Sequence, residues 1–131
     1  MSFSLDGIEK ILERQVVGPG INIFRKGEAG DIAYIVMRGE VEIFTFKENN
    51  EPVFLAKVGR GQMFGEMSLL NNRTRTATAF TKDGAELLKI PHRFLQKKLG
   101  AVDPFVRYWV EYLANRVMDL SSRFEGPNAP P

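Results

Sequence analysis

Cysteine is absent from this sequence of 131 residues, and histidine occurs once, at His92. The absence of thiols excludes disulfides, thiol catalysis, iron–sulfur clusters and cysteine-based zinc sites. One histidine cannot by itself supply a histidine-rich metal site, so no metal site is predicted. No Gly-x-Gly-x-x-Gly sequence follows a strand to indicate a dinucleotide enzyme. These absences favour a protein that is not an enzyme.

Long apolar runs and clusters of one charge are also missing. No stretch approaches the roughly 20 apolar residues of a membrane span. The N-terminal segment Met1–Asp6 lacks the basic and apolar regions of a signal peptide. No run of lysine and arginine reaches five residues and the net charge is +2, which indicates neither a nucleic-acid nor a membrane surface. We therefore expect one cytoplasmic domain, large enough to bury its own core.

Short alternating segments separated by glycine turns fill most of the chain. The expected strands are residues 21–25, 32–37, 41–46, 53–58, 75–81 and 86–90. Strands repeated at intervals of about ten residues indicate an antiparallel barrel or sandwich. A flanking helix is expected at residues 4–15, where Leu5, Ile8 and Ile11 recur at helical spacing. A second, two-turn helix is expected between Pro91 and Gly100.

The longest predicted helix spans residues 103–124, with Asp103 as its N-cap and Pro104 in its first turn. A heptad-like seam runs along it through Val106, Val110, Leu113, Val117, Leu120 and Phe124, beside a second stripe of Phe105, Trp109 and Tyr112. These faces fit either one wide surface packed on its own domain or one stripe that meets a second chain. Residues 126–131 are rich in proline, glycine and asparagine and are predicted to form a disordered tail.

The centre of the chain combines a glycine, an acid, a short helical turn and an arginine. Gly65 allows a sharp turn, and Glu66–Leu70 is suited to one helical turn whose leading amides can face an anion. Together with the guanidinium of Arg75, such a helix start is a receptor for a single phosphate. Glu66 can accept a hydrogen bond from a hydroxyl of the same ligand. The residue types also fit a surface ion pair between Glu66 and Arg75 or a neighbouring arginine.

This central stretch resembles the phosphate-binding cassette of the cyclic nucleotide-binding domain family. The resemblance rests on Phe64–Leu69, Arg73–Thr78, Phe24–Asp31, Tyr34–Val36 and Gly39. The family includes bacterial catabolite activator proteins, regulatory domains of cyclic nucleotide-dependent kinases and gated channels. It implies a mainly β fold with flanking helices: an eight-stranded antiparallel β-roll, jelly-roll-like, with an N-terminal helix and C-terminal B- and C-helices.

The resemblance also implies a ligand site. Arg75 would pair with the cyclic phosphate and Glu66 with the ribose 2′-hydroxyl. Groups around Gly65, Met67, Ser68 and Thr76 would complete the pocket. Thr74 stands where the family more often has proline, and Ser68 where alanine is usual. Thr76 resembles domains that favour cyclic GMP, whereas the family's base rate favours cyclic AMP.

We therefore expect a stand-alone regulatory module in residues 1–125 that binds a cyclic nucleotide and signals by movement of its C-terminal helices. Helix 103–124 would be the C-helix, which in the family covers the base and often forms a dimer seam. The expected partners are a cyclic nucleotide, a second copy of the chain and an unidentified effector protein; no DNA-binding domain is expected. The alternative is that the fold serves as a ligand-free protein-interaction domain.

Overall fold

The computed structural model describes residues 5–66, 68 and 74–124, with side chains up to residue 116. The chain divides into two compact units, one that ends at His92 and one that begins at Arg93. The first unit holds all the strands that the structure describes, and the second holds most of the helical residues. Among the described helices, none has the length and apolarity that crossing a bilayer requires.

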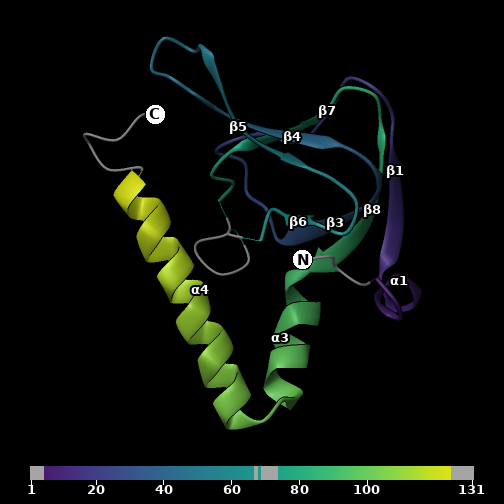
Figure 1. The fold of residues 1–131 in the computed structure, drawn as a ribbon, viewed down its shortest axis with the longest axis vertical. Helices are drawn as coiled ribbons and strands as arrows, with labels where there is room; N and C mark the ends of the chain where they lie inside the picture. The colour runs from purple at the N-terminus through teal and green to yellow at the C-terminus, as the bar shows by residue number, and fades with distance from the viewer. Residues whose placement is uncertain (1–4, 67, 69–73, 125–131) are drawn as a thin grey trace. The chain divides into compact units, whose positions relative to one another are not determined.

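The described part of the first unit has eight strands, paired antiparallel in two four-stranded sheets (Figure 1). The first sheet has the order β1 (Glu13–Val17), β8 (Ala85–Pro91), β3 (Ile32–Gly39) and β6 (Met63–Phe64). The second has the order β2 (Ile21–Phe24), β7 (Thr78–Thr81), β4 (Val41–Phe46) and β5 (Pro52–Val58). The helices are α1 (Ile8–Ile11), α3 (His92–Ala101) and α4 (Pro104–Phe124). The predicted fold class, antiparallel β with flanking helices, is confirmed.

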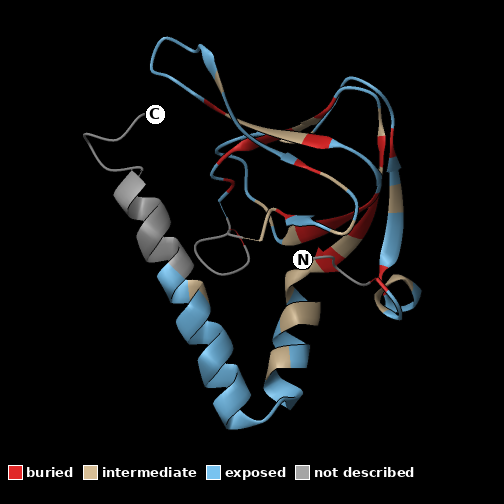
Figure 2. Ribbon diagram, in the orientation of Figure 1, coloured by how far each residue is buried: buried red, intermediate tan, exposed pale blue. Residues whose placement is uncertain are grey.

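The core lies between the two sheets. Val36 and Leu87 from the first sheet and Val41 and Ala79 from the second are fully buried and belong to one apolar cluster. Figure 2 shows this burial along the strands. Successive side chains of a regular strand point to opposite faces, so the neighbours of a core position face away from the core. In β3 these neighbours, Ile35 and Met37, are buried as well.

The N-terminal helix predicted at residues 4–15 is wrong over its second half. Helix α1 has only four residues, and Leu12 is already extended, with φ −111° and ψ 146°. Strand β1 begins at Glu13 and pairs with β8. Helical spacing of apolar residues is only a weak indication of a helix over so short a segment. Here the pairing of β1 with β8 stabilises the extended conformation instead, and Val17 is buried.

The predicted long helix is confirmed at its start. The backbone N–H of Phe105 donates to Oδ1 of Asp103 at 2.8 Å, so Asp103 caps the first turn and Pro104 is the first helical residue. Helix α3 begins at His92, because Pro91 still belongs to β8, and it continues one residue past Gly100. The predicted tail, residues 126–131, lies outside the described residues.

Candidate ligand-binding site

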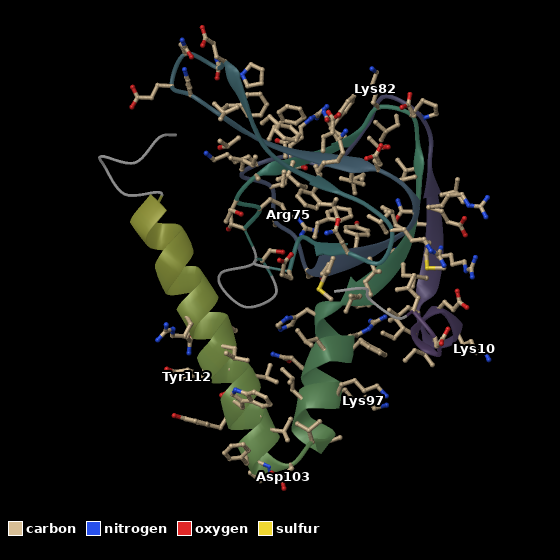
Figure 3. All side chains as sticks on the ribbon, in the orientation of Figure 1. Lys10, Arg75, Lys82, Lys97, Asp103 and Tyr112 are labelled. Carbon is tan, nitrogen blue, oxygen red and sulfur yellow. The ribbon has the colours of Figure 1, made fainter. Side chains whose placement is uncertain are left out.

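Arg75 is buried although it carries a full charge; it is 5% exposed. It lies on the segment that leads into β7, within the unit formed by the two sheets (Figure 3). Its backbone N–H donates to the carbonyl of Glu28 at 2.8 Å, and its carbonyl accepts from the N–H of Gly27 at 2.9 Å. These two bonds attach Arg75 to the loop between β2 and β3.

Three oxygen atoms accept hydrogen bonds from the guanidinium. Nη1 of Arg75 donates to Oγ of Ser68 at 2.8 Å and to the carbonyl of Gly65 at 3.3 Å, and Nη2 donates to the carbonyl of Ile32 at 2.7 Å. The Ser68 hydroxyl donates to the Gly65 carbonyl at 3.0 Å, which leaves its lone pairs for Arg75. The structure therefore brings Arg75 beside Gly65 and Ser68, as the sequence spacing predicts.

An aromatic ring and two glycines enclose the guanidinium. Cζ of Arg75 lies 3.9 Å from the centroid of the Phe24 ring, within the range of a cation–π contact. A β-carbon at Gly30 would overlap Nε and Cζ of Arg75. Gly65 has φ +79°, and a β-carbon there would lie 3.0 Å from Nη1. The chain therefore needs residues without side chains at both positions.

Among the residues that the structure describes, no carboxylate forms an ion pair with Arg75. Burial lowers the pKa of the Arg75 guanidinium, while Tyr34, Asp31 and Glu28 oppose that shift from a distance. Burial likewise raises the pKa of the Tyr34 phenol, against the effect of Arg75. A guanidinium stays protonated at neutral pH, so the site holds an enclosed positive charge that the described part of the chain does not pair with a carboxylate.

Two of the other predicted site residues are placed by the structure. Glu66 is half-buried and makes no ion pair with Arg75, so the alternative of a surface ion pair between these two residues is wrong. Thr76, directly after Arg75, is exposed. Met67 and Arg73 lie outside the described residues.

Phe24, Gly30 and Ile32 contribute to the site although their residue types and spacing do not predict it. The two glycines of the β2–β3 loop, Gly27 and Gly30, indicate a tight turn, but their spacing does not reveal which side chain needs the room. Ile32 contributes through its backbone carbonyl. The residue type cannot predict this contact, because every residue has a carbonyl. Phe24 and Gly30 lie in the segment Phe24–Asp31 that resembles the family, and that resemblance is the signal that could have identified these two residues.

The chain matches the family model of the cyclic nucleotide-binding domain over residues 14–101. The cAMP-dependent protein kinase regulatory subunit of Yarrowia lipolytica is 34% identical over 101 residues, which are 77% of this chain and 26% of that protein. The chain thus spans about a quarter of the length of the first curated relatives it matches.

Solved structures share the fold. The catabolite activator protein of Thermus thermophilus superimposes with a TM-score of 0.72 at 26% identity, over 92% of this chain and 61% of that one. The cAMP-bound form of the EAL enzyme Bd1971 gives 0.71 at 26% identity, over 86% of this chain and 30% of that one; its cGMP-bound form also gives 0.71 at 26% identity, with coverages of 85% and 30%. With the match to the family model, the two-sheet fold and the arginine of the cassette in agreement, the chain belongs to the cyclic nucleotide-binding domain family.

Proposed function

We propose that this chain is a regulatory module that binds a cyclic nucleotide through the cassette around Arg75. The observation that carries the proposal is the enclosed guanidinium with no carboxylate partner among the described residues. A cyclic phosphate carries a single negative charge, and arginine is well matched to it in charge and hydrogen-bond geometry. The ligand class is supported by the relatives, which include a cAMP-dependent regulatory subunit and structures with bound cAMP and cGMP.

Each predicted site residue has a role in this proposal. Arg75 holds the cyclic phosphate, and Glu66 accepts a hydrogen bond from the ribose 2′-hydroxyl. The remaining contacts come from groups around Gly65, Met67, Ser68 and Thr76. The position of Glu66, half-buried and outside any described ion pair, leaves its carboxylate available for a hydroxyl donor. No metal or other cofactor takes part.

Cyclic AMP is the favoured ligand and cyclic GMP the second candidate. The names of the kinase regulatory relatives specify cAMP. Thr76 is the observation that favours cyclic GMP, because its hydroxyl is exposed beside Arg75 and can accept a hydrogen bond from the guanine amino group. Both nucleotides are therefore compared in the experiment below.

The module is proposed to regulate rather than to catalyse, as a cytoplasmic domain of residues 1–125. Helices α3 and α4 belong mostly to a compact unit of their own, and this division supports a mechanism in which they move relative to the sheets. In this mechanism the protein has two states that differ in the position of these helices. Ligand binding shifts the population between them only as far as the affinity of the ligand for the two states differs. The moved helices then signal to an effector protein.

The same helices are proposed to join two copies of the chain. On α4, the side chains of Val106, Val110 and Leu113 are 42%, 38% and 48% exposed, and they follow the heptad-like seam. A second α4 in the same register would cover this seam. The dimer is therefore part of the proposal.

Titration calorimetry with cyclic AMP and cyclic GMP tests the assignment of Arg75. The Arg75→Ala variant should lose about 2–5 kcal/mol of binding free energy, as expected for one member of a buried charge pair. Arg38→Ala is the matched control, since it removes an exposed arginine outside the cassette. Unchanged affinity in Arg75→Ala would contradict the assignment.

The ligand-free interaction domain is the competing function. This function replaces the proposed one if calorimetry of the wild-type chain detects no heat of binding and its melting temperature does not shift with either nucleotide at about millimolar concentration. The enclosed Arg75 argues against it, because a buried charge that no described carboxylate pairs with destabilises the fold, and a bound anion would offset that cost.

A further inference from the structure

The outer face of the second sheet carries several phenylalanines. In β4, Ile43 packs on the core, so Phe44 and Phe46 lie on the opposite face. Phe80 of β7 pairs with Glu42, which shares that outer face with Phe44. Three aromatic side chains from two neighbouring strands are thus gathered away from the core.

A bulge in β5 adds a fourth. Ile43 pairs with Ala56 and Phe44 pairs with Phe54, so one residue, Leu55, is passed over. In a regular ladder Leu55 would lie opposite Phe44, and Phe54 would turn inward. Instead the Phe54 ring meets the Phe44 ring edge-on, with centroids 5.7 Å apart and planes at 73°. The bulge therefore keeps Phe54 at the surface, where it is 54% exposed.

A groove of about 430 Å³ is hollowed in this face. Phe44, Phe46, Phe80 and Pro52 form its apolar lining, its charged lining residues are Arg25 and Lys26, and its other two lining residues are uncharged. The volume falls in the range of small-molecule pockets, about 300–1,000 Å³. Thr78, at the end of the cassette segment, lines the groove, but none of the residues proposed to contact the nucleotide does, so the two sites have separate linings.

The charged end of the groove has no acid among its lining residues. Neither Arg25 nor Lys26 takes part in an ion pair among the described residues. Glu28 accepts the backbone N–H of Arg25 at 2.6 Å, and Nζ of Lys26 donates to the Thr45 hydroxyl at 3.0 Å. Glu42 shares the outer face but does not line the groove. Thr45 lies on the core side of β4 and does not line the groove, so the Lys26 ammonium is directed away from the phenylalanines. The remaining cation, Arg25, lies outside the ion pairs of the described residues, and beside an aromatic floor it is complementary to an anion with an apolar body.

We propose that this groove binds a small amphiphilic monoanion, with a medium-chain fatty acid as the model ligand. The hydrocarbon chain lies against Phe44, Phe46 and Phe80, and the carboxylate meets Arg25. The groove volume suits one drug-sized molecule, whereas a stable protein interface needs about 800 Å² from each partner. The occupant is therefore a free small molecule rather than a protein segment.

Two fluorescent probes separate the anionic from the apolar contribution in the full chain. 1-Anilinonaphthalene-8-sulfonate carries a charge, and N-phenyl-1-naphthylamine has the same rings without it. We expect one saturable site that binds the anion about tenfold more tightly than the neutral probe.

Arg25→Gln should remove this preference, and Arg25→Lys should keep it. Phe46→Ser should weaken both probes about tenfold; Phe46 is 37% exposed at the end of β4, so its loss spares the core.

Competition identifies the occupant. Dodecanoate should displace the anionic probe, dodecanol should need about a tenfold higher concentration, and cyclic AMP should not displace it. Phe105→Ser, which removes a 69% exposed aromatic from α4, should leave probe binding unchanged. Displacement by cyclic AMP would assign the probe to the cassette, and displacement by acetyl-Asp-Phe-Glu-Phe-amide but not by dodecanoate would make the occupant a protein segment. Either result overturns the proposal, as does equal affinity for the two probes or an unchanged preference in Arg25→Gln.

Discussion

Arg75 is a charge held inside a β-roll by neutral groups. Transferring an ion out of water is unfavourable by several kcal/mol, roughly, even after the protein relaxes. Three oxygen acceptors and the face of Phe24 replace part of the lost hydration. Nε of Arg75 is a buried donor that finds no acceptor within the described ranges of the chain. The side chain is thus oriented before a ligand arrives, and little ordering is left for the binding step.

Gly30→Ala should disable the site without touching a polar group. The added methyl group would occupy the space of Nε and Cζ and would lie 2.8 Å from Cδ of Arg75, so the guanidinium must leave its acceptors. We expect a loss of about 1–3 kcal/mol in unfolding free energy and a loss of nucleotide affinity like that of Arg75→Ala. Urea denaturation and calorimetry measure the two effects.

Gly18→Ala is the control for that substitution, because a β-carbon at Gly18 meets nothing within 4 Å. It should leave both quantities unchanged. A Gly30→Ala variant with wild-type stability and affinity would show that Arg75 does not need its observed position.

Ser68→Ala tests the hydroxyl that links Arg75 to Gly65. Ser68 is 2% exposed, and its removal takes an acceptor from Nη1 of Arg75 in a place that water does not reach. The unfolding free energy in urea should fall by about 1–3 kcal/mol with an unchanged m-value. Thr76→Ala, at an exposed position of the same segment, should change it by less than about 0.5 kcal/mol. Equal stability of the two variants would remove the structural role of the hydroxyl.

Among the elements, the strands that alternate clearly are predicted from the sequence, and those that depend on distant partners are not. β4 has a clean period of two and is predicted with its observed bounds, residues 41–46. β1 and β6 are absent from the prediction: β1 is fixed by pairing with β8, and β6 has two residues, too few for any periodicity. The bulge at Leu55 is likewise set by the partner strand.

The candidate site is likewise predictable from the sequence only in part. Gly65, Glu66 and Arg75 stand out by type and spacing, and their resemblance to the cassette supplies the proposed roles. Two of the contacts that hold Arg75 come from a ring and a carbonyl more than 40 residues away in sequence, those of Phe24 and Ile32. Such contacts depend on the closure of the two sheets, which residue types alone do not specify.

The cap of α4 is a test at the scale of one element. Asp103→Ala removes the acceptor of the Phe105 N–H and should weaken the first turn by about 1 kcal/mol. The opened population should then rise about fivefold, and tryptic cleavage after Arg107, followed by mass spectrometry, should accelerate by the same factor. Asp103→Asn keeps a capping oxygen and should cleave at the wild-type rate. Similar rates for all three chains would contradict the capping role.

Besides the groove on the outer face of the second sheet, apolar side chains of the described residues gather in two settings. The two sheets bury their facing side chains in one cluster, as Figure 2 shows. Helix α4 instead leaves Phe105, Tyr108 and Trp109 more than half exposed. Contiguous apolar side chains of this size on a surface indicate an interaction site. The first setting stabilises the fold, and the second is consistent with the proposed dimer.

Light scattering with and without cyclic AMP tests that dimer. Leu113→Glu adds a charge on the α4 seam and should give a monomer at concentrations where the wild-type chain is a dimer, since two like charges would meet in the seam. Arg116→Glu introduces the same residue at an exposed position off the seam and should remain dimeric. If Leu113→Glu keeps the wild-type mass, or if the wild-type chain is a monomer throughout, the seam does not join two copies.

The backbone of the loop between β2 and β3 is hydrogen-bonded to residues 75–78, the segment that carries Arg75. Gly27 donates its N–H to the carbonyl of Arg75, Arg75 donates its own to Glu28, and Lys26 donates to the hydroxyl of Thr78. A ligand that binds Arg75 also changes the strength of these hydrogen bonds. The amide protons of Gly27 and Arg75 therefore report on whether the site is occupied. Their rates of exchange with deuterium would record occupancy of the site in a mixture of metabolites, before the identity of the ligand is known.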